Sequence, residues 1–276
     1  VNWERRKKIG LGYDFSYIRS GEEFNPGIGF QARDDYSFYY SNILYGWLSN
    51  KKSPVFKQNV FLHGEVFNSI SEKTVESVVI NPGYEISFKS GFYGNIEFNI
   101  NYENLLDTFE IEEDKVFAEP GDYTFFDFEA AVLTRQSKPL WVLVMFNAGS
   151  FYDGTKYTVS LSPIWNISSS WEISGEYEYN NVDFSGRNQT FISHIMRLKA
   201  LYMLNTKFSV SSFIQYNSAA DIILTNFRFR YNPREGNDFY IVYNEGMNTN
   251  LDREIPALPG TFSRTILLKY TYTFRL

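Results

Sequence analysis

Lys-Tyr-Thr-Val-Ser-Leu-Ser, at residues 156–162, alternates polar and apolar side chains without a break. A period of two is the signature of a β-strand, so Tyr157, Val159 and Leu161 share one face and the polar residues share the other. The alternation recurs in about fifteen segments, with Tyr and Trp gathered near the segment ends. One apolar and one wet face are typical of a barrel in a membrane. The sequence therefore predicts an all-β fold, an antiparallel transmembrane β-barrel with about 14–16 strands in this chain.

The composition excludes several classes of protein. The longest apolar run is Leu140–Phe146, whereas a membrane-spanning helix needs roughly 20 apolar residues. There is no cysteine, which excludes disulfide scaffolds, thiol catalysis and cysteine-ligated metals. The formal net charge of -6 argues against nucleic-acid binding. Only two histidines, His63 and His194, are present, and they lie on separate predicted strands, so we expect no histidine-based catalytic or metal site.

We expect residues 1–276 to form one outer-membrane β-barrel domain, the C-terminal portion of a longer protein. Val1–Lys8 looks like the end of a preceding segment, and the first predicted strands are Ile9–Ile18 and Asn25–Ala32. Long connections, such as Asn104–Gly121 and Glu245–Ser263, tend to alternate with short turns. Because outer-membrane barrels have short periplasmic turns and longer external loops, this pattern predicts a bacterial outer-membrane location.

Charged residues of the predicted strands fall on the polar face, which we expect to line the lumen because a charge in mid-bilayer is costly. Negative and positive charges lie on different strands, and two interpretations are open. Opposed charges create a transverse field that filters polar solutes, or they pair across strands and fill the lumen. No catalytic residue is expected, because inward glutamates are ordinary in an aqueous lumen. The residues expected to face the lumen are Glu97, Glu172, Glu176, Glu178, Arg197, Lys199, Arg228, Arg230 and Lys269.

Two strands fit the alternation badly. In Tyr36–Leu48 both faces are apolar, and in the strand Phe191–Leu204 the mainly apolar face carries His194. Either these strands pack against a plug inside the barrel, or their register differs from the one that the pattern predicts.

Calcium is the one cofactor that the sequence suggests. Asn248, Asn250, Asp252 and Glu254 have the alternate spacing of a calcium-binding loop, without its central glycine and distal glutamate. The acidic connection Asn104–Asp122 is a second candidate. A solvated acidic loop is the alternative for both.

The end of the chain resembles a known family. Residues 243–253 and 264–274 are similar to the C-terminus of an uncharacterised Bacteroidetes outer-membrane family, and residues 24–33 are similar to a second segment of it. Members carry an N-terminal domain like family-nine carbohydrate-binding modules, followed by a large barrel. The resemblance implies an outer-membrane location and a link to glycan handling. The last strand, with Phe274 near its end, also resembles the signal read by the barrel-assembly machinery.

Three hypotheses follow. The first is a non-enzymatic outer-membrane barrel for the passage or handling of polar solutes or glycans, in contact with membrane lipid, with the assembly machinery and with other envelope proteins or glycans. The second is a non-conducting structural or partner subunit of an envelope complex. The third is a soluble glycan-binding or glycan-cleaving β protein, in which the aromatic residues would form sugar platforms.

Overall fold

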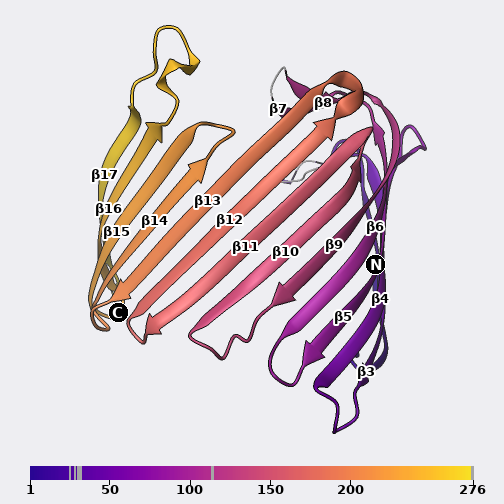
Figure 1. The fold of residues 1–276 in the computed structure, drawn as a ribbon, viewed down its shortest axis with the longest axis horizontal. Helices are drawn as coiled ribbons and strands as arrows, with labels where there is room; N and C mark the ends of the chain where they lie inside the picture. The colour runs from indigo at the N-terminus through magenta and orange to yellow at the C-terminus, as the bar shows by residue number, and fades with distance from the viewer. Residues whose placement is uncertain (25, 28, 30–32, 113–114, 275–276) are drawn as a thin grey trace. The chain divides into compact units, whose positions relative to one another are not determined.

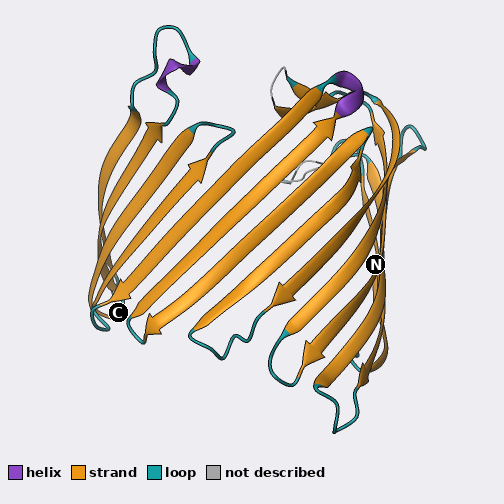
Figure 2. Cartoon of the chain, in the orientation of Figure 1, coloured by secondary structure: helices purple, strands orange, loops and turns teal. Residues whose placement is uncertain are grey.

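The structure is a computed structural model that describes residues 1–24, 26–27, 29, 33–112 and 115–274. It has one large antiparallel sheet of 15 strands and a separate two-stranded hairpin (Figure 1). Two short 3-10 helices, Ser185–Arg187 and Leu251–Arg253, lie between strands (Figure 2). The strands of the large sheet are β1 (Asn2–Arg5), β2 (Gly10–Ser20), β3 (Tyr36–Leu48), β4 (Val55–Ser69), β5 (Val75–Phe88), β6 (Tyr93–Leu105), β9 (Gly121–Leu133), β10 (Leu140–Phe151), β11 (Gly154–Ser168), β12 (Trp171–Phe184), β13 (Gln189–Met203), β14 (Phe208–Asn217), β15 (Ile222–Arg234), β16 (Asn237–Asn248) and β17 (Thr261–Tyr272).

Neighbours in the sheet are also neighbours in sequence, except that the hairpin of β7 (Phe109–Glu112) and β8 (Val116–Ala118) separates β6 from β9. The prediction of an all-β antiparallel fold is therefore confirmed. β1 and β17 stand at the two ends of the strand order, and closure of the sheet into a barrel is not found within the described residues. Among those residues, no helix combines the length and the hydropathy needed to cross a bilayer.

The chain divides into two compact units. Unit 1 comprises Val1–Val132, Met145–Thr158 and Asn181–Phe191, and unit 2 comprises Leu133–Val144, Val159–Asn180 and Ile192–Leu276. In each unit the cross-strand register sorts side chains onto two faces, because paired residues of an antiparallel sheet point the same way.

In unit 1, Tyr39, Val66 and Val78 are aligned on one face, which we call the apolar face. Asn42 pairs with His63, and His63 pairs with Asn81, on the other, polar face. In unit 2 the apolar face aligns Leu198 with Ile214, and the polar face aligns Arg197 with Gln215.

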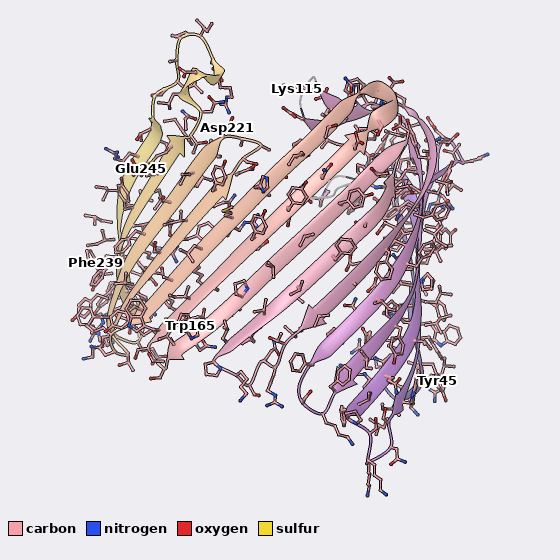
Figure 3. All side chains as sticks on the ribbon, viewed as in Figure 1. Tyr45, Lys115, Trp165, Asp221, Phe239 and Glu245 are labelled. Atoms are coloured by element: carbon pink, nitrogen blue, oxygen red, sulfur yellow. The ribbon has the colours of Figure 1, made fainter. Side chains whose placement is uncertain are left out.

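Few large apolar side chains are buried. The buried hydrophobic residues of the described chain are Val116, Ala118, Phe125, Ala131, Val182 and Phe184, all in unit 1. Many more are exposed, including two that Figure 3 labels, Tyr45 (54% exposed) and Trp165 (48% exposed). The alternating strands thus bury little against their own chain.

The structure corrects three expectations. Asn2–Arg5, for which the sequence pattern predicts no strand, forms β1, in which Trp3 packs against Tyr13 and Phe15 of β2 with ring centroids 4.8 and 5.7 Å apart. The predicted strand Asn25–Ala32 falls mostly outside the described residues, and its residues 26, 27 and 29 are not in a strand. The expected loop Asn104–Gly121 contains the β7–β8 hairpin, because Val116 and Ala118 are buried in it.

Gly83 of β5 makes room for an aromatic ring. It pairs with Phe61 of β4, and a Cβ atom on Gly83 would meet atoms of the Phe61 ring at 2.1–2.7 Å. The ring of Phe61 therefore lies across the backbone of β5 on the polar face of unit 1.

We predict that Gly83→Ala destabilises the fold by about 1–3 kcal/mol, because the new methyl group displaces the Phe61 ring. The midpoint of thermal unfolding measures the effect. Adding Phe61→Ala to the Gly83→Ala variant should recover part of the loss, and a Gly83→Ala protein as stable as the wild type would contradict this packing.

Candidate functional site: two polar faces

The charged residues predicted on β13–β17 share the polar face of unit 2. Arg197 and Lys199 pair with Gln215 and Phe213, and Arg228 and Arg230 pair with Ser211 and Ser209, across registers that keep one face aligned. Lys269 pairs with Tyr240, which itself pairs with Arg230. On β12, Glu172, Glu176 and Glu178 occupy alternate positions, and the Arg197–Glu176 ion pair ties them to this face.

Two of these arginines form ion pairs with a carboxylate on a neighbouring strand. Arg197 Nη1 lies 2.6 Å from Glu176 Oε1, and Arg230 Nε lies 2.6 Å from Asp238 Oδ1. Pairing across strands, the second of the two interpretations, therefore describes Arg197 and Arg230. Both pairs are partly exposed, so solvent screening keeps the contribution of each pair to stability small.

Other charges on this face have no such partner. Within the described part of the chain, Lys199, Arg228 and Lys269 form no ion pair, while Glu178 accepts a 2.7 Å hydrogen bond from the amide of Asn180. Within the described residues, the polar face of unit 2 thus combines paired charges with unpaired cations and with two carboxylates, Glu172 and Glu178, that form no ion pair.

The polar face of unit 1 carries a row of amide, carboxylate and imidazole side chains that the sequence did not reveal, and we call it the amide row. Asp14, Asn42, His63 and Asn81 are aligned across β2–β5. The row continues through hydrogen bonds from Asn81 to Asn99, from Asn99 to Asp127 at 2.6 Å, and from Asn147 to Asp127 at 2.5 Å. Its members lie on seven strands, so only the register brings them together. Glu97 lies on the same face, opposite Gly83, and accepts a 2.9 Å hydrogen bond from Asn95.

A cavity of about 400 Å³ opens beside the amide row. Its lining combines two carboxylates, two amides, one imidazole and two apolar side chains, from Asn42, Leu44, Phe61, His63, Asn81, Glu85 and Glu97. The side-chain oxygens Oδ1 of Asn42 and Asn81 are buried and have no hydrogen-bond partner among the described residues. Since the lining has acceptors but no lysine or arginine, this cavity disfavours anions.

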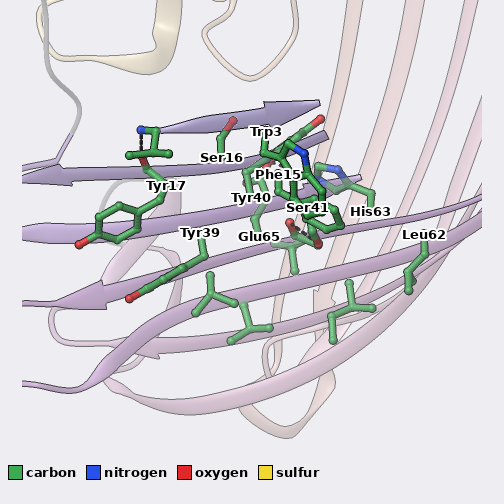
Figure 4. Close-up of a pocket in the computed structure, with 16 residues that line it drawn as sticks. Trp3, Phe15, Ser16, Tyr17, Tyr39, Tyr40, Ser41, Leu62, His63 and Glu65 are labelled. Atoms are coloured by element: carbon green, nitrogen blue, oxygen red, sulfur yellow. Dashed lines mark hydrogen bonds and ion pairs between the residues drawn. The ribbon is translucent and has the colours of Figure 1, made fainter. Parts of the chain in front are cut away.

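The opposite face of unit 1 is hollowed between aromatic side chains. A groove of about 580 Å³ runs over β1–β5, with Ser41 and Gly64 among its lining residues. Figure 4 shows Tyr17 and Tyr39 along it, with ring centroids 5.1 Å apart. The amino group of Val1 donates to the carbonyl of Tyr17 at 2.8 Å, the bond drawn at the end of the groove. Apart from Ser41 and Gly64, the residues of the apolar face that line the groove are aliphatic and aromatic, so the groove is suited to an apolar neighbour.

His194 does lie on the apolar face of unit 2, because it is on the same side of β13 as Met196 and Leu198. Its Nδ1 is 2.9 Å from the hydroxyl of Tyr177, and the two rings are stacked 6.1 Å apart. The pairing with Tyr177 explains how one histidine is accommodated among apolar side chains without a change of register.

The β7–β8 hairpin is held by a small core in unit 1. Val116 and Ala118 pack with Val182 and Phe184, and Phe184 is 1% exposed. Arg187 stacks on the Phe184 ring at 4.5 Å and forms an ion pair with Asp153 at 2.8 Å. Beside this core, burial and the Glu103 carboxylate, which accepts a 2.7 Å hydrogen bond from Tyr152, raise the pKa of the Tyr152 hydroxyl.

Three of the four candidate calcium ligands, all except Asp252, contact other groups. The amide of Asn248 donates to the carbonyl of Pro259 at 2.8 Å, the amide of Asn250 donates to Asp221 at 3.3 Å, and Glu254 lies 3.5 Å from Arg253. No group of three or more His, Cys, Asp or Glu side chains that could hold a metal ion occurs in the described ranges. Of the acidic connection, residues 113 and 114 lie outside those ranges.

Comparisons with known proteins add no identification. A scan against protein-family models finds no match, and neither does a search of curated proteins. The resemblance to the Bacteroidetes family therefore stays a prediction.

We predict that Phe184→Ala opens the β7–β8 hairpin, because removing a fully buried ring costs about 3–5 kcal/mol. Tryptic cleavage after the exposed Lys115, followed by mass spectrometry, should be at least about tenfold faster in the variant. Phe128→Ala, on the apolar face, is the matched control and should leave the rate unchanged. Equal rates in Phe184→Ala and the wild type would refute the proposed anchoring.

A second prediction concerns pH and two connecting loops. The hydroxyl and backbone N–H of Ser71 donate to Asp35 at 2.5 and 3.0 Å, and these bonds lower the pKa of the Asp35 carboxyl. A lowered pKa means that the carboxylate stabilises the folded loops above the ordinary aspartate pKa of about 3.9 and that this stabilisation is lost as the pH falls through the lowered value.

Hydrogen exchange at the Ser71 amide tests this. At neutral pH, Asp35→Asn, which mimics the protonated carboxyl, should show less protection than the wild type, and the two proteins should converge in strong acid. Equal protection at neutral pH would show that the carboxylate charge contributes nothing.

Proposed function

We propose that this chain is a non-enzymatic β-barrel domain of the bacterial outer membrane, in which the apolar faces contact lipid and the polar faces line a passage for polar solutes. The observation that carries the proposal is the reversal of the usual burial pattern. Large apolar side chains are exposed along one face of each unit, and among the described residues only six hydrophobic side chains are buried, four of them in the core beside the β7–β8 hairpin. Soluble monomers rarely expose contiguous apolar patches of more than a few hundred Å².

Strand length supports the same proposal. Apart from the short β1, the strands of the large sheet have between 10 and 15 residues. A strand of 13 residues, such as β3, is about 43 Å long, and a tilt of about 45° reduces its span to about 30 Å, the thickness of the hydrocarbon core. Strands in soluble sheets are usually half as long.

The few charges on the apolar faces lie near strand ends. Glu245 and Arg264 pair with each other at 2.5 Å on the apolar face, three residues from the end of β16 and three from the start of β17. Arg19 is next to the last residue of β2. The cost of a charge on the lipid face falls from about 2–4 kcal/mol at the midplane to about 0–1 near the interface, so these positions are tolerable in a membrane.

The solute class follows from the polar faces. Unit 1 offers amides and carboxylates, and unit 2 offers paired charges with additional cations and carboxylates. We propose polar solutes or glycans as cargo, with membrane lipid, the barrel-assembly machinery and other envelope proteins as partners.

Reconstitution of the purified chain in planar bilayers tests the proposal, and we expect discrete ion conductance. Arg228→Ala should shift selectivity toward cations, because it removes an unpaired positive charge from the polar face of unit 2. Arg264→Ala is the matched control, since it removes an arginine from the apolar face and should leave selectivity unchanged. If both variants behave like the wild type, the polar face does not line the conducting path.

A non-conducting barrel is the second candidate, and β3 favours it. Its polar-face positions include Phe38, Tyr40 and Leu44, side chains that suit a filled interior. A chain that inserts into bilayers and stays silent would support a structural role, whereas a chain that is monodisperse in buffer without detergent would overturn both membrane proposals.

A further inference from the structure

The polar face of β3 and β4 in unit 1 is unusually aromatic. Tyr36, Phe38 and Tyr40 occupy alternate positions of β3, and Phe67 and Phe61 lie on the same face of β4 because they pair with Phe38 and Leu44. We call these five residues the aromatic column. From the sequence alone this strand fitted the alternation badly, and the register establishes that its second face is aromatic as well.

The rings of the column follow one another along the strands. Phe38 and Phe67 have centroids 4.4 Å apart, Tyr36 lies 5.6 Å from Phe67, and Phe38 lies 6.4 Å from Tyr40. Tyr40 then meets the imidazole of His63 edge-on at 5.1 Å. Between Tyr36 and Leu44 the column covers about 26 Å of strand, enough for several small rings in sequence.

The column leads to the acceptor-rich cavity. Phe61, its last ring, lines that cavity together with His63, Asn42 and Asn81. At the other end, the Arg33 guanidinium stacks on the Phe67 ring at 4.4 Å. A molecule lying along the column would therefore place one face on aromatic rings and its edge on amide and carboxylate oxygens.

We propose that the aromatic column and the adjoining cavity bind a neutral oligosaccharide. A sugar ring has an apolar C–H face that stacks on aromatic rings and a rim of hydroxyl groups that donate hydrogen bonds. The carboxylates of Glu85 and Glu97 provide acceptors for those hydroxyls, and the buried, unpartnered oxygens of Asn42 and Asn81 belong to the same polar lining. The absence of lysine and arginine from the cavity lining excludes anionic sugars as the preferred ligand. This inference rests on the proposed function, because it requires the polar face to be in water.

Isothermal titration of the full chain in detergent micelles tests the proposal. The neutral probes are maltohexaose, cellohexaose and N-acetylchitohexaose, and spermine is the cationic probe. We expect saturable binding of at least one neutral probe at concentrations up to about 10 mM, where a site of millimolar affinity is filled. Saturable binding of none of them, or tighter binding of spermine, overturns the proposal.

Matched variants locate the site. Tyr40→Leu keeps an apolar side chain of similar volume but removes the ring, and it should weaken binding by about tenfold. Tyr39→Leu changes the neighbouring residue on the apolar face and should stay within about twofold of the wild type. Equal losses in these two variants would contradict binding on the polar face.

A variant in the cavity and a second measurement distinguish loss of binding from unfolding of the protein. Asn81→Ala removes a polar side chain of the cavity lining without touching the column, and it should also weaken binding by at least about threefold. The same preparation is placed in planar bilayers, so the two proposals fail separately. Conductance without sugar binding overturns the oligosaccharide site alone, whereas sugar binding without insertion overturns the membrane location and keeps the site.

Discussion

The cross-strand register is the constraint on which this structure depends. Every strand of the large sheet pairs with antiparallel neighbours, and side chains alternate between faces with a period of two. A slip of one residue in any strand would exchange all its apolar and polar side chains. The amide row of unit 1 and the charged face of unit 2 exist only because neighbouring strands keep their registers, as in the series Asn42, His63 and Asn81.

The same constraint explains why the chain has so little interior. Alternation places one apolar set on a single face of each strand, and a single sheet layer has no second layer to cover it. Backbone hydrogen bonds between strands, rather than a large buried core, hold such a sheet together. The exception is the C-terminal end of β12, where side chains of the polar face are apolar and buried. Its polar-face positions carry Glu176 and Glu178 in one part and Val182 and Phe184 at the end, where the hairpin packs.

The alternation within each strand predicts where most strands lie and which side chains share a face, but it does not predict which residues of different strands become partners. The alternation located β3 and β10 with their observed bounds, Tyr36–Leu48 and Leu140–Phe151. It also assigned Arg197, Arg228 and Lys269 to the polar sides of their strands. It could not tell that Arg230 pairs with Asp238, since partners on different strands are set by register and not by the pattern within one strand. β1 and β8 were missed because four and three residues are too few for a period to be recognised. The amide row left no local signal, because each strand contributes one member.

The central claim is that the two faces of each strand meet different solvents, and β12 of unit 2 allows a direct measurement. The chain has no cysteine, so single cysteines can be placed at each position from 173 to 180 and spin-labelled after reconstitution in lipid vesicles. We expect labels at 173, 177 and 179 to collide mainly with lipid-soluble oxygen and labels at 174, 176 and 178 mainly with a water-soluble nickel chelate. Uniform accessibility to the nickel chelate along the strand would contradict the account.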